Sequence, residues 1–246
     1  MDNSSIKAVV LAAGKGTRLQ SDGNTLPKVM RVAAGKPLLF HVLKALGFIQ
    51  PKDCIIVVGY KKDSVMEAFP EYVFAEQKEQ LGTGHAVMAA FSQLDGFSGS
   101  LLVCCGDMPL IKRETYEALI AEHRAAGNTC TILSGTSKLN LPYGRILRDP
   151  QGNFVGMVED KDASPQQKAI KELNSGVYVF DAPALRDVLS ELKSDNAQGE
   201  YYLTDAPRLM QQKGCKIGVC RRELGYEIIG VNTPEQLKQT EELILG

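Results

Sequence analysis

The stretch that decides the fold is residues 6–31, IKAVVLAAGKGTRLQSDGNTLPKVMR. An apolar run at residues 6–13, typical of a buried strand, leads directly into the glycine-rich segment GKGTR. Glycine permits a tight backbone turn and lets main-chain N–H groups approach a ligand closely. Lys15, Arg18 and Lys28 add three cations around the same loop. The stretch therefore predicts a strand that opens into a phosphate-binding loop.

Two common phosphate-binding motifs do not fit this loop. The dinucleotide-binding motif needs a third glycine, but position 19 is Leu19, and no acidic residue closes a second strand about 20 residues further on. The P-loop needs Gly-Lys-Ser/Thr after four intervening residues, and this pattern is absent from the sequence. An isolated Gly-x-Gly after a strand can also be an ordinary turn. A phosphate loop of another type remains.

Helix and strand patterns alternate through the first half of the chain. This alternation implies right-handed crossovers, so the expected fold class is α/β, with a Rossmann-like, mostly parallel twisted sheet flanked by helices. Ligands in such folds gather at the carboxyl ends of the strands. We expect helices at 36–48, 62–69, 84–94 and 113–126, and strands at 54–60, 72–76, 100–107 and 129–135.

The rhythm changes after residue 140. Three short strands in GRILRD, FVGMVED and VYVFD are separated by turns, which predicts a small antiparallel lobe laid over the sheet. Helices are expected again at 182–192 and 203–213. Strands in KIGVCRR and EIIGV should follow, and then a final helix from Thr233 with proline in its first turn.

Composition describes a globular chain of 246 residues, long enough to bury a full core. Hydrophobic residues make up 44% and charged residues 23%, and a net charge of −1 offers no basic surface for nucleic acid. The N-terminal MDNSSIK is not an apolar signal segment, and no apolar run reaches membrane-spanning length. We therefore expect a cytoplasmic protein that binds neither nucleic acid nor membrane.

The six cysteines are expected to be free thiols. Most lie inside apolar runs and none has a Cys-x-x-Cys spacing, which favours buried thiols in a reducing compartment over zinc or disulfides. His41, His85 and His123 are too scattered in the sequence to predict a metal site. The cysteines are Cys54, Cys104, Cys105, Cys130, Cys215 and Cys220.

One acidic residue stands out because it follows the apolar run SLLVCCG. Asp107 would lie at the carboxyl end of a buried strand, next to the phosphate loop. Magnesium prefers few protein oxygens, with water and substrate phosphates completing its shell, so this carboxylate with one neutral oxygen would suffice. Asp before Met-Pro is also common in turns, so a purely structural turn residue is the alternative.

Short motifs along nearly the whole chain, in the same order, resemble the sugar nucleotidylyltransferases. Within that family they are most similar to the uridylyltransferases that act on N-acetylglucosamine 1-phosphate. The motifs are LAAGKGTRL with LPKV, QLGTGHA at 80–86, GDMPLI at 106–111, YGRI at 143–146, VEDKDA at 158–163, LNSGVYVF at 173–180, NAQGEYYLTD at 196–205 and GVN at 230–232.

The resemblance implies an enzyme that makes UDP-N-acetylglucosamine, a cell-wall precursor, and pyrophosphate from UTP and N-acetylglucosamine 1-phosphate, with Mg²⁺ as cofactor. Its catalytic residues would be Arg18, Lys28 and Asp107, with Mg²⁺ held by Asp107 and Asn232. The attacking phosphate monoester, whose second pKa is ~6, is largely dianionic at neutral pH, so no general base is needed. Catalysis then reduces to alignment and charge neutralisation. Asn232 could otherwise cap the final helix.

For the nucleotide, the resemblance implies a uridine pocket formed by main-chain groups of residues 11–14 with Gln77 and Gly82. An amide side chain and backbone groups can pair with both the donor and the acceptors on the edge of uracil. Considered singly, Gln77 and Gln80 read as surface glutamines, and Thr83 reads as a helix cap.

For the sugar, Gly144, Glu159 and Asn174 match the family positions that hold its hydroxyls and acetamido group. Carboxylate and amide side chains suit vicinal hydroxyls, because a wrong sugar would leave buried polar groups unsatisfied. Each could also be an ordinary exposed polar residue without a binding role. The complete set of substrate-binding residues that the resemblance implies is Leu11, Ala12, Ala13, Gly14, Lys28, Gln77, Gly82, Thr83, Gly106, Asp107, Gly144, Glu159, Asn174 and Asn232, with Glu200, Tyr202 and Thr204 nearby.

The chain departs from the family pattern at three places. Cys105 stands where relatives commonly carry Tyr, Ser175 replaces Thr, and two extra residues near Gly23 and Asn24 lengthen the phosphate loop. These departures leave open another sugar 1-phosphate or nucleotide as substrate. A nucleotide-sugar binding module without turnover is the alternative from another class, and a dehydrogenase fits poorly because of Leu19.

We expect one nucleotidylyltransferase domain over residues 1–246. Its nucleotide-binding part would be residues 1–139, its sugar-binding lobe with returning strands 140–232, and its C-terminal helix 233–246. The sequence has no hexapeptide repeats, so the acetyltransferase half of many relatives is not expected in it. A monomer is the default expectation.

Overall fold

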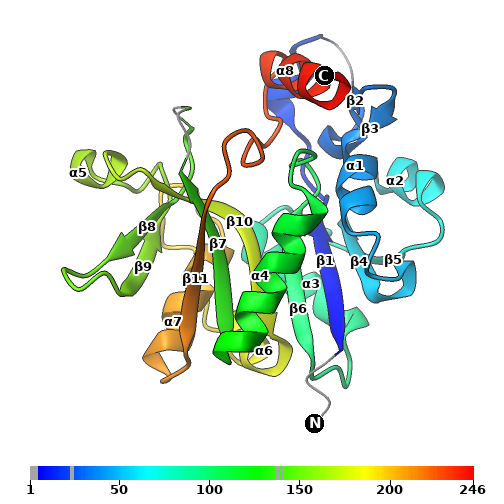
Figure 1. Cartoon of the computed structure of the whole chain (residues 1–246). Coiled ribbons are helices and arrows are strands. Elements are labelled where there is room, and N and C mark those ends of the chain that lie inside the picture. The colour runs from blue at the N-terminus through cyan, green and yellow to red at the C-terminus, as the bar shows by residue number, and fades with distance from the viewer. Residues whose placement is uncertain (1–4, 23–24, 137–138, 140) are drawn as a thin grey trace.

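The computed structural model describes residues 5–22, 25–136, 139 and 141–246. Its central feature is a nine-stranded sheet with the order β11-β7-β10-β6-β1-β4-β5, to which β8 and β9 are attached (Figure 1). The strands are β1 (Ile6–Leu11), β4 (Cys54–Val58), β5 (Val73–Glu76), β6 (Ser100–Cys105), β7 (Cys130–Thr136), β8 (Arg145–Arg148), β9 (Phe154–Val158), β10 (Glu172–Asp181) and β11 (Ile217–Glu223).

Along the seven-strand path from β11 to β5, four of the six strand pairs are parallel, which confirms the expected α/β class with a mostly parallel sheet. Strand β1 pairs in parallel with β4 and β6, β4 with β5, and β11 with β7. Strand β10 runs antiparallel between β6 and β7. The small antiparallel part is therefore present, but it does not lie over the sheet as expected: the β8–β9 hairpin joins the main sheet through β10.

Strand β10 pairs both with the main sheet and with the β8–β9 hairpin, and its register changes along its length. The pairing with β7 shifts between Asn174 and Val177, next to Gly176 with φ +76°. A bulge of this kind bends a strand and re-aims its side chains. The first half of β10 thus carries Asn174 toward the lobe, while the second half packs in the main sheet.

Helices cover both faces of the sheet because strand side chains alternate between them. In β1, Ala8 and Val10 pack into one core and Val9 into the other, and all three are fully buried. One face carries α1 (Leu38–Ala45), α2 (Lys62–Ala68) and α4 (Arg113–Ala126), and the other carries α3 (Thr83–Ala90), α6 (Ala182–Leu189) and α7 (Ala206–Gln212).

The remaining elements lie around the sheet. Figure 1 shows α8 packed beside β2 and β3. They are β2 (Val32–Ala33), β3 (Lys36–Pro37), α5 (Pro165–Lys168), α8 (Pro234–Leu245) and the 3-10 turns η1 (Thr17–Asp22), η2 (Lys28–Met30), η3 (Pro51–Asp53), η4 (Phe91–Gln93) and η5 (Leu203–Asp205).

Four expected elements differ from the structure. The helix expected at 36–48 starts only at Leu38, because Lys36–Pro37 pairs as β3. The helices at 84–94 and 203–213 each divide into an α-helix and a 3-10 turn. The strand expected in EIIGV is wrong: these residues form a turn and loop, and their apolar character reflects burial of Ile228, Ile229 and Val231 in the core.

All six cysteines are free, and four of them are buried. Burial raises the pKa of Cys54 to about 12 and that of Cys220 to about 11. Within the described part of the chain, every helix is too short or too polar to cross a bilayer.

Candidate functional site

Neighbouring strands bring the phosphate loop and Asp107 to the same edge of the sheet. Strands β1 and β6 pair in register up to Leu11 and Cys105, so both chains leave the sheet side by side. The amide of Gly106 donates to the carbonyl oxygen of Leu11 at 2.9 Å, and that of Ala12 donates to Val57 at 2.9 Å. Asp107 thus follows the strand that lies next to the loop.

The loop closes on itself at Gly16. This residue has φ +66°, and a Cβ there would lie 2.6 Å from the Cβ of Lys28. Glycine is required because a side chain would be strained and would push Lys28 away. Lys28 therefore lies directly against the glycine loop. Lys15, by contrast, is exposed, and its Nζ lies 5.9 Å from the ring centroid of Tyr60.

At the centre of the site, Lys28 contacts both predicted metal ligands. Its Nζ forms an ion pair with Asp107 and donates to Asn232 Oδ1 at 2.7 Å. Arg18 Nη2 donates to the same Oδ1 at 3.0 Å. The side chains of Lys28 and Asp107 are only 15% and 18% exposed, so little water screens this pair.

The donor set at this point suits a divalent cation. One carboxylate oxygen of Asp107 and the amide oxygen of Asn232 already converge on the positive charge of Lys28. Magnesium takes oxygen ligands of this kind and leaves its other positions to water and phosphates. Among the described residues there is no group of three or more His, Cys, Asp or Glu side chains that could hold a metal. Asp107 and Asn232 are thus the residues that fit.

Hydrogen bonds with neighbouring residues fix the position of Asn232, which does not cap a helix. Its Nδ2 donates to Gly230 O at 2.9 Å, while the amide of Val231 donates to Asp107 O at 2.9 Å. The alternative that Asn232 caps the last helix is wrong, because Thr233 is the N-cap and forms a capping box with Gln236.

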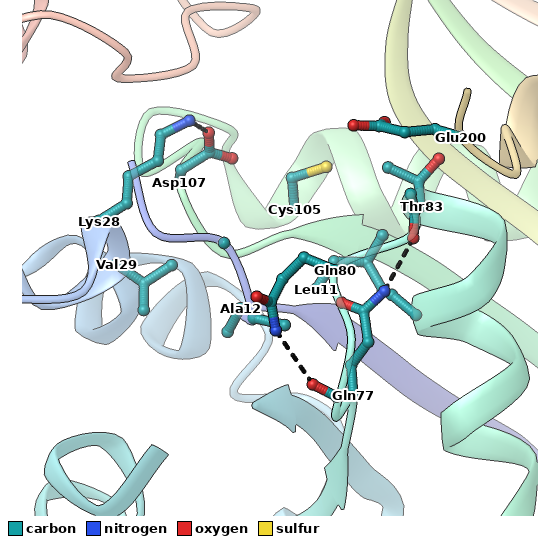
Figure 2. Close-up of a pocket in the computed structure, with 14 residues that line it drawn as sticks. Leu11, Ala12, Lys28, Val29, Gln77, Gln80, Thr83, Cys105, Asp107 and Glu200 are labelled. Atoms are coloured by element: carbon teal, nitrogen blue, oxygen red, sulfur yellow. Dashed lines mark hydrogen bonds and ion pairs between the residues drawn. The ribbon is translucent and has the colours of Figure 1, made fainter. Parts of the chain in front are cut away.

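The first cavity, of about 250 Å³, lies beside the phosphate loop (Figure 2). Gln77 is 4% exposed, and its Nε2 donates to Gly82 O at 3.0 Å, so the surface alternative for this residue is wrong. Predicted substrate-binding residues that line this cavity are Leu11, Ala12, Ala13, Gly14, Lys28, Gln77, Gly82, Thr83 and Asp107, joined by Val29, Gln80, Ala86, Cys105 and Glu200.

Two residues on the far side of this cavity differ from expectation. Thr83 does not cap α3, whose N-cap is Gly82; its Oγ1 instead accepts from the amide of Leu203 at 3.0 Å. Glu200, expected near the sugar, lines the cavity next to Thr83 (Figure 2). Figure 2 also shows Cys105 between these residues and the Lys28–Asp107 pair.

A second cavity, of about 190 Å³, adjoins the first at Cys105 and Asp107. The Gly144 carbonyl accepts from the amide of Asn174 at 2.8 Å. Burial raises the pKa of Glu159 above its ordinary value, although a hydrogen bond with Thr204 partly offsets this. The predicted sugar residues that line this cavity are Gly144, Glu159 and Asn174, and Asp107 and Asn232 line it as well.

The polar atoms of Asn174 are already engaged inside β10. Its Nδ2 donates to Tyr178 Oη at 2.7 Å, and its Oδ1 accepts from the amide of Gly176 at 3.1 Å. The neighbouring Ser175 donates to Leu133 O at 2.7 Å, so its hydroxyl has a structural role.

A third cavity, of about 660 Å³, is lined by Arg18, Glu159 and Asn232 together with Tyr143 and Lys161. Tyr143 and Lys161 were not singled out by sequence reasoning, although they belong to the motifs YGRI and VEDKDA. The predicted residue Gly106 is buried, and packs behind the first cavity against Leu11, Val29 and Leu39. The loop extension at Gly23 and Asn24 lies outside the described residues.

Comparisons with known proteins show which family the chain belongs to. Over 238 residues the chain is 45% identical to the bifunctional protein GlmU of Caldanaerobacter subterraneus subsp. tengcongensis, covering 96% of this chain and 51% of that protein. The GlmU of Syntrophotalea carbinolica is 44% identical over an alignment of 248 positions that covers 99% of this chain and 52% of the relative. The chain therefore spans about half the length of the curated relatives it matches.

Solved structures share the fold at low identity. A UDP-glucose pyrophosphorylase complexed with UDP-glucose aligns with a TM-score of 0.75 at 19% identity, covering 98% of this chain and 99% of the other. A putative glucose-1-phosphate thymidylyltransferase from Bacillus anthracis aligns with a TM-score of 0.73 at 16% identity, covering 97% and 95%. The family model of the MobA-like NTP transferase domain matches residues 8–204. The chain belongs to this family of nucleotidyltransferases.

Proposed function

We propose that this protein transfers the uridylyl group of UTP to N-acetylglucosamine 1-phosphate, forming UDP-N-acetylglucosamine and pyrophosphate. The observation that carries the proposal is the convergence of Lys28 with Asp107 and Asn232 where the first two cavities meet. The relatives named GlmU, at 40–45% identity, support the same reaction class.

In this proposal the nucleotide occupies the first cavity. The buried Gln77 and the main chain of residues 11–14 offer both donors and acceptors to a pyrimidine edge. Because Gln77 Nε2 is held by Gly82 O, its orientation is set before ligand binds, which reduces the entropy lost on binding.

The sugar occupies the second cavity, with its phosphate toward Asp107. Glu159 and the Gly144–Asn174 pair form the wall of this cavity. A carboxylate that accepts from vicinal hydroxyls discriminates strongly, because an analogue that lacks one hydroxyl leaves a buried polar group unpaired.

Asp107 and Asn232 would hold Mg²⁺, which would supply positive charge for the phosphates of both substrates. Lys28 and Arg18 neutralise the triphosphate and the charge that develops on the α-phosphoryl oxygens. The attacking phosphate oxygen is already ionised at neutral pH, so the residues around it orient it and exclude water rather than remove a proton.

A substrate panel tests the proposal. Pyrophosphate release should be fastest with UTP and N-acetylglucosamine 1-phosphate, compared with CTP, GTP and dTTP and with other sugar 1-phosphates. A faster rate with another pair would overturn the named substrates but keep the reaction class. Binding of UDP-N-acetylglucosamine without any Mg²⁺-dependent pyrophosphate release would instead favour a binding module.

A further inference from the structure

The hydroxyl of Tyr143 contacts the segment that carries Asn232. Tyr143 lies in the loop before β8 and lines both the second and the third cavity. Its Oη accepts from the amide of Gly230 at 2.7 Å. The same Gly230 accepts, at its carbonyl oxygen, a hydrogen bond from Asn232 Nδ2 at 2.9 Å, so one residue joins the two side chains.

A second set of contacts ties this short segment to Asp107. The amide of Val231 donates to the carbonyl oxygen of Asp107 at 2.9 Å. The hydrogen bonds at Gly230 and Val231 therefore hold the backbone that leads into Asn232, and the bond from Asn232 Nδ2 holds its side chain against that backbone. Removal of any one of them would widen the range of positions that Oδ1 can occupy.

Tyr143 is itself anchored in the antiparallel lobe. Arg145 is 4% exposed, and its Nη1 donates to the carbonyl oxygen of Tyr143. Its Nη2 pairs with Asp160 at 3.1 Å, and Asp160 directly follows Glu159. The buried guanidinium thus connects the loop of Tyr143 with the turn that carries Glu159.

Packing around Gly230 leaves little freedom. A Cβ at this position would lie 3.1 Å from Tyr143 Oη, 3.5 Å from Asn232 Nδ2 and 3.6 Å from Asp107 Oδ2. The Tyr143 hydroxyl, the Asn232 amide and the Asp107 carboxylate therefore surround one glycine.

We propose that Tyr143 is a positioning residue that holds Asn232 opposite Asp107 through the backbone of Gly230, and so links the sugar lobe to the cation site. The inference rests on the proposed function, because it treats Asp107 and Asn232 as the residues that hold Mg²⁺. It assigns Tyr143 no contact with the reacting atoms.

The variant Tyr143→Phe removes the hydroxyl and keeps the ring, and Tyr226→Phe, at a tyrosine that is 51% exposed, is the matched control. In Tyr143→Phe, amide hydrogen exchange at Gly230 should quicken about fivefold, since one hydrogen bond is lost. The gain in affinity for UDP-N-acetylglucosamine when Mg²⁺ is added, measured by calorimetry, should fall about tenfold. At saturating Mg²⁺ the KM for UTP should stay within about twofold, because Tyr143 is not among the residues that line the first cavity.

Unchanged exchange at Gly230, or an unchanged Mg²⁺-dependent gain in affinity, would overturn the proposal. So would a weaker affinity for UTP that persists at saturating Mg²⁺, since that indicates a general packing role for Tyr143. Wild-type protein that releases no pyrophosphate with any substrate pair would instead overturn the proposed function. The exchange measurement needs no turnover and tests the Tyr143–Gly230 contact in either case.

The variant Gly230→Ala perturbs the same Tyr143–Gly230 contact by changing the glycine instead of the tyrosine. Its methyl group would crowd the Tyr143 hydroxyl at 3.1 Å, and should weaken the Mg²⁺-dependent gain about tenfold. In the double variant the hydroxyl is absent, so the crowding is relieved and the two losses should not multiply. A double variant whose loss equals the product of the single losses would show that the residues act independently, and would overturn the proposal.

Discussion

Lys28 Nζ donates to Asn232 Oδ1 at 2.7 Å across 204 positions of sequence, and the same ammonium group pairs with Asp107. One cation thereby occupies the space between the two oxygen atoms proposed to hold Mg²⁺. The positive charge of Lys28 compensates the Asp107 carboxylate, and in the proposed function it would lie adjacent to the substrate phosphates.

Lys28→Ala should lower kcat/KM for pyrophosphate release by about 100-fold or more, since it removes a fixed charge where negative charge develops in the transition state. Lys52→Ala, at an exposed lysine, is the control for loss of one positive charge. The measurement is steady-state kinetics with UTP and N-acetylglucosamine 1-phosphate. Near-normal turnover of the Lys28 variant would remove this residue from the mechanism.

Asp107→Asn should raise the free Mg²⁺ concentration needed for half-maximal activity at least about tenfold, because it removes the only formal charge of the proposed donor pair. Chelation of divalent metal should abolish activity in the wild type. The control is Asp95→Asn, which makes the same change at an exposed position. An identical Mg²⁺ requirement in the Asp107 and Asp95 variants would contradict the assignment.

Gly16→Ala should destabilise the protein by about 1–3 kcal/mol and lower the affinity for UTP, because the new methyl group meets Lys28 at a positive φ. Gly127→Ala is the matched control: it also has positive φ, +58°, but a Cβ there meets nothing within 4 Å. Chemical denaturation and UTP titration separate the two variants. If Gly127→Ala weakened UTP binding equally, crowding of Lys28 would not be the cause.

Glu159→Gln should increase thermal stability at pH 7 while it impairs sugar binding. Burial raises the pKa of Glu159, so the folded state disfavours the ionised carboxylate. A raised acid pKa means that the folded state binds a proton more tightly than the unfolded state. The free-energy cost of ionising Glu159 in the folded protein therefore destabilises the wild type as pH rises above the pKa of this group in the unfolded chain. This cost is absent below about pH 4. Tm measured from pH 3.5 to 7.5 should show the difference between the two proteins growing with pH, and a pH-independent difference would contradict this account.

Much of the fold could be predicted from local sequence patterns. The apolar run before Gly14, the helix–strand alternation and the capping residues around Pro234 depend on neighbouring residues, so periodicity alone indicates them. The same reasoning failed for EIIGV, since burial on all sides and strand pairing produce the same apolar pattern. It also missed that β10 enters the main sheet, because strand neighbours are chosen by long-range pairing.

The site likewise combines features that local sequence predicts with contacts that only the tertiary structure forms. By itself, the sequence determined the glycine loop with its cations and a carboxylate at the end of a buried strand, because these features are local. Only the tertiary structure decided that Lys28, Asp107 and Asn232 meet. It also decided that Thr83 accepts a hydrogen bond from Leu203 instead of capping its own helix, and that Tyr143 accepts one from Gly230. The physical reason is that these contacts join segments whose closeness arises from the packing of the sheet and lobe, and no periodic pattern within one segment encodes the distance to another.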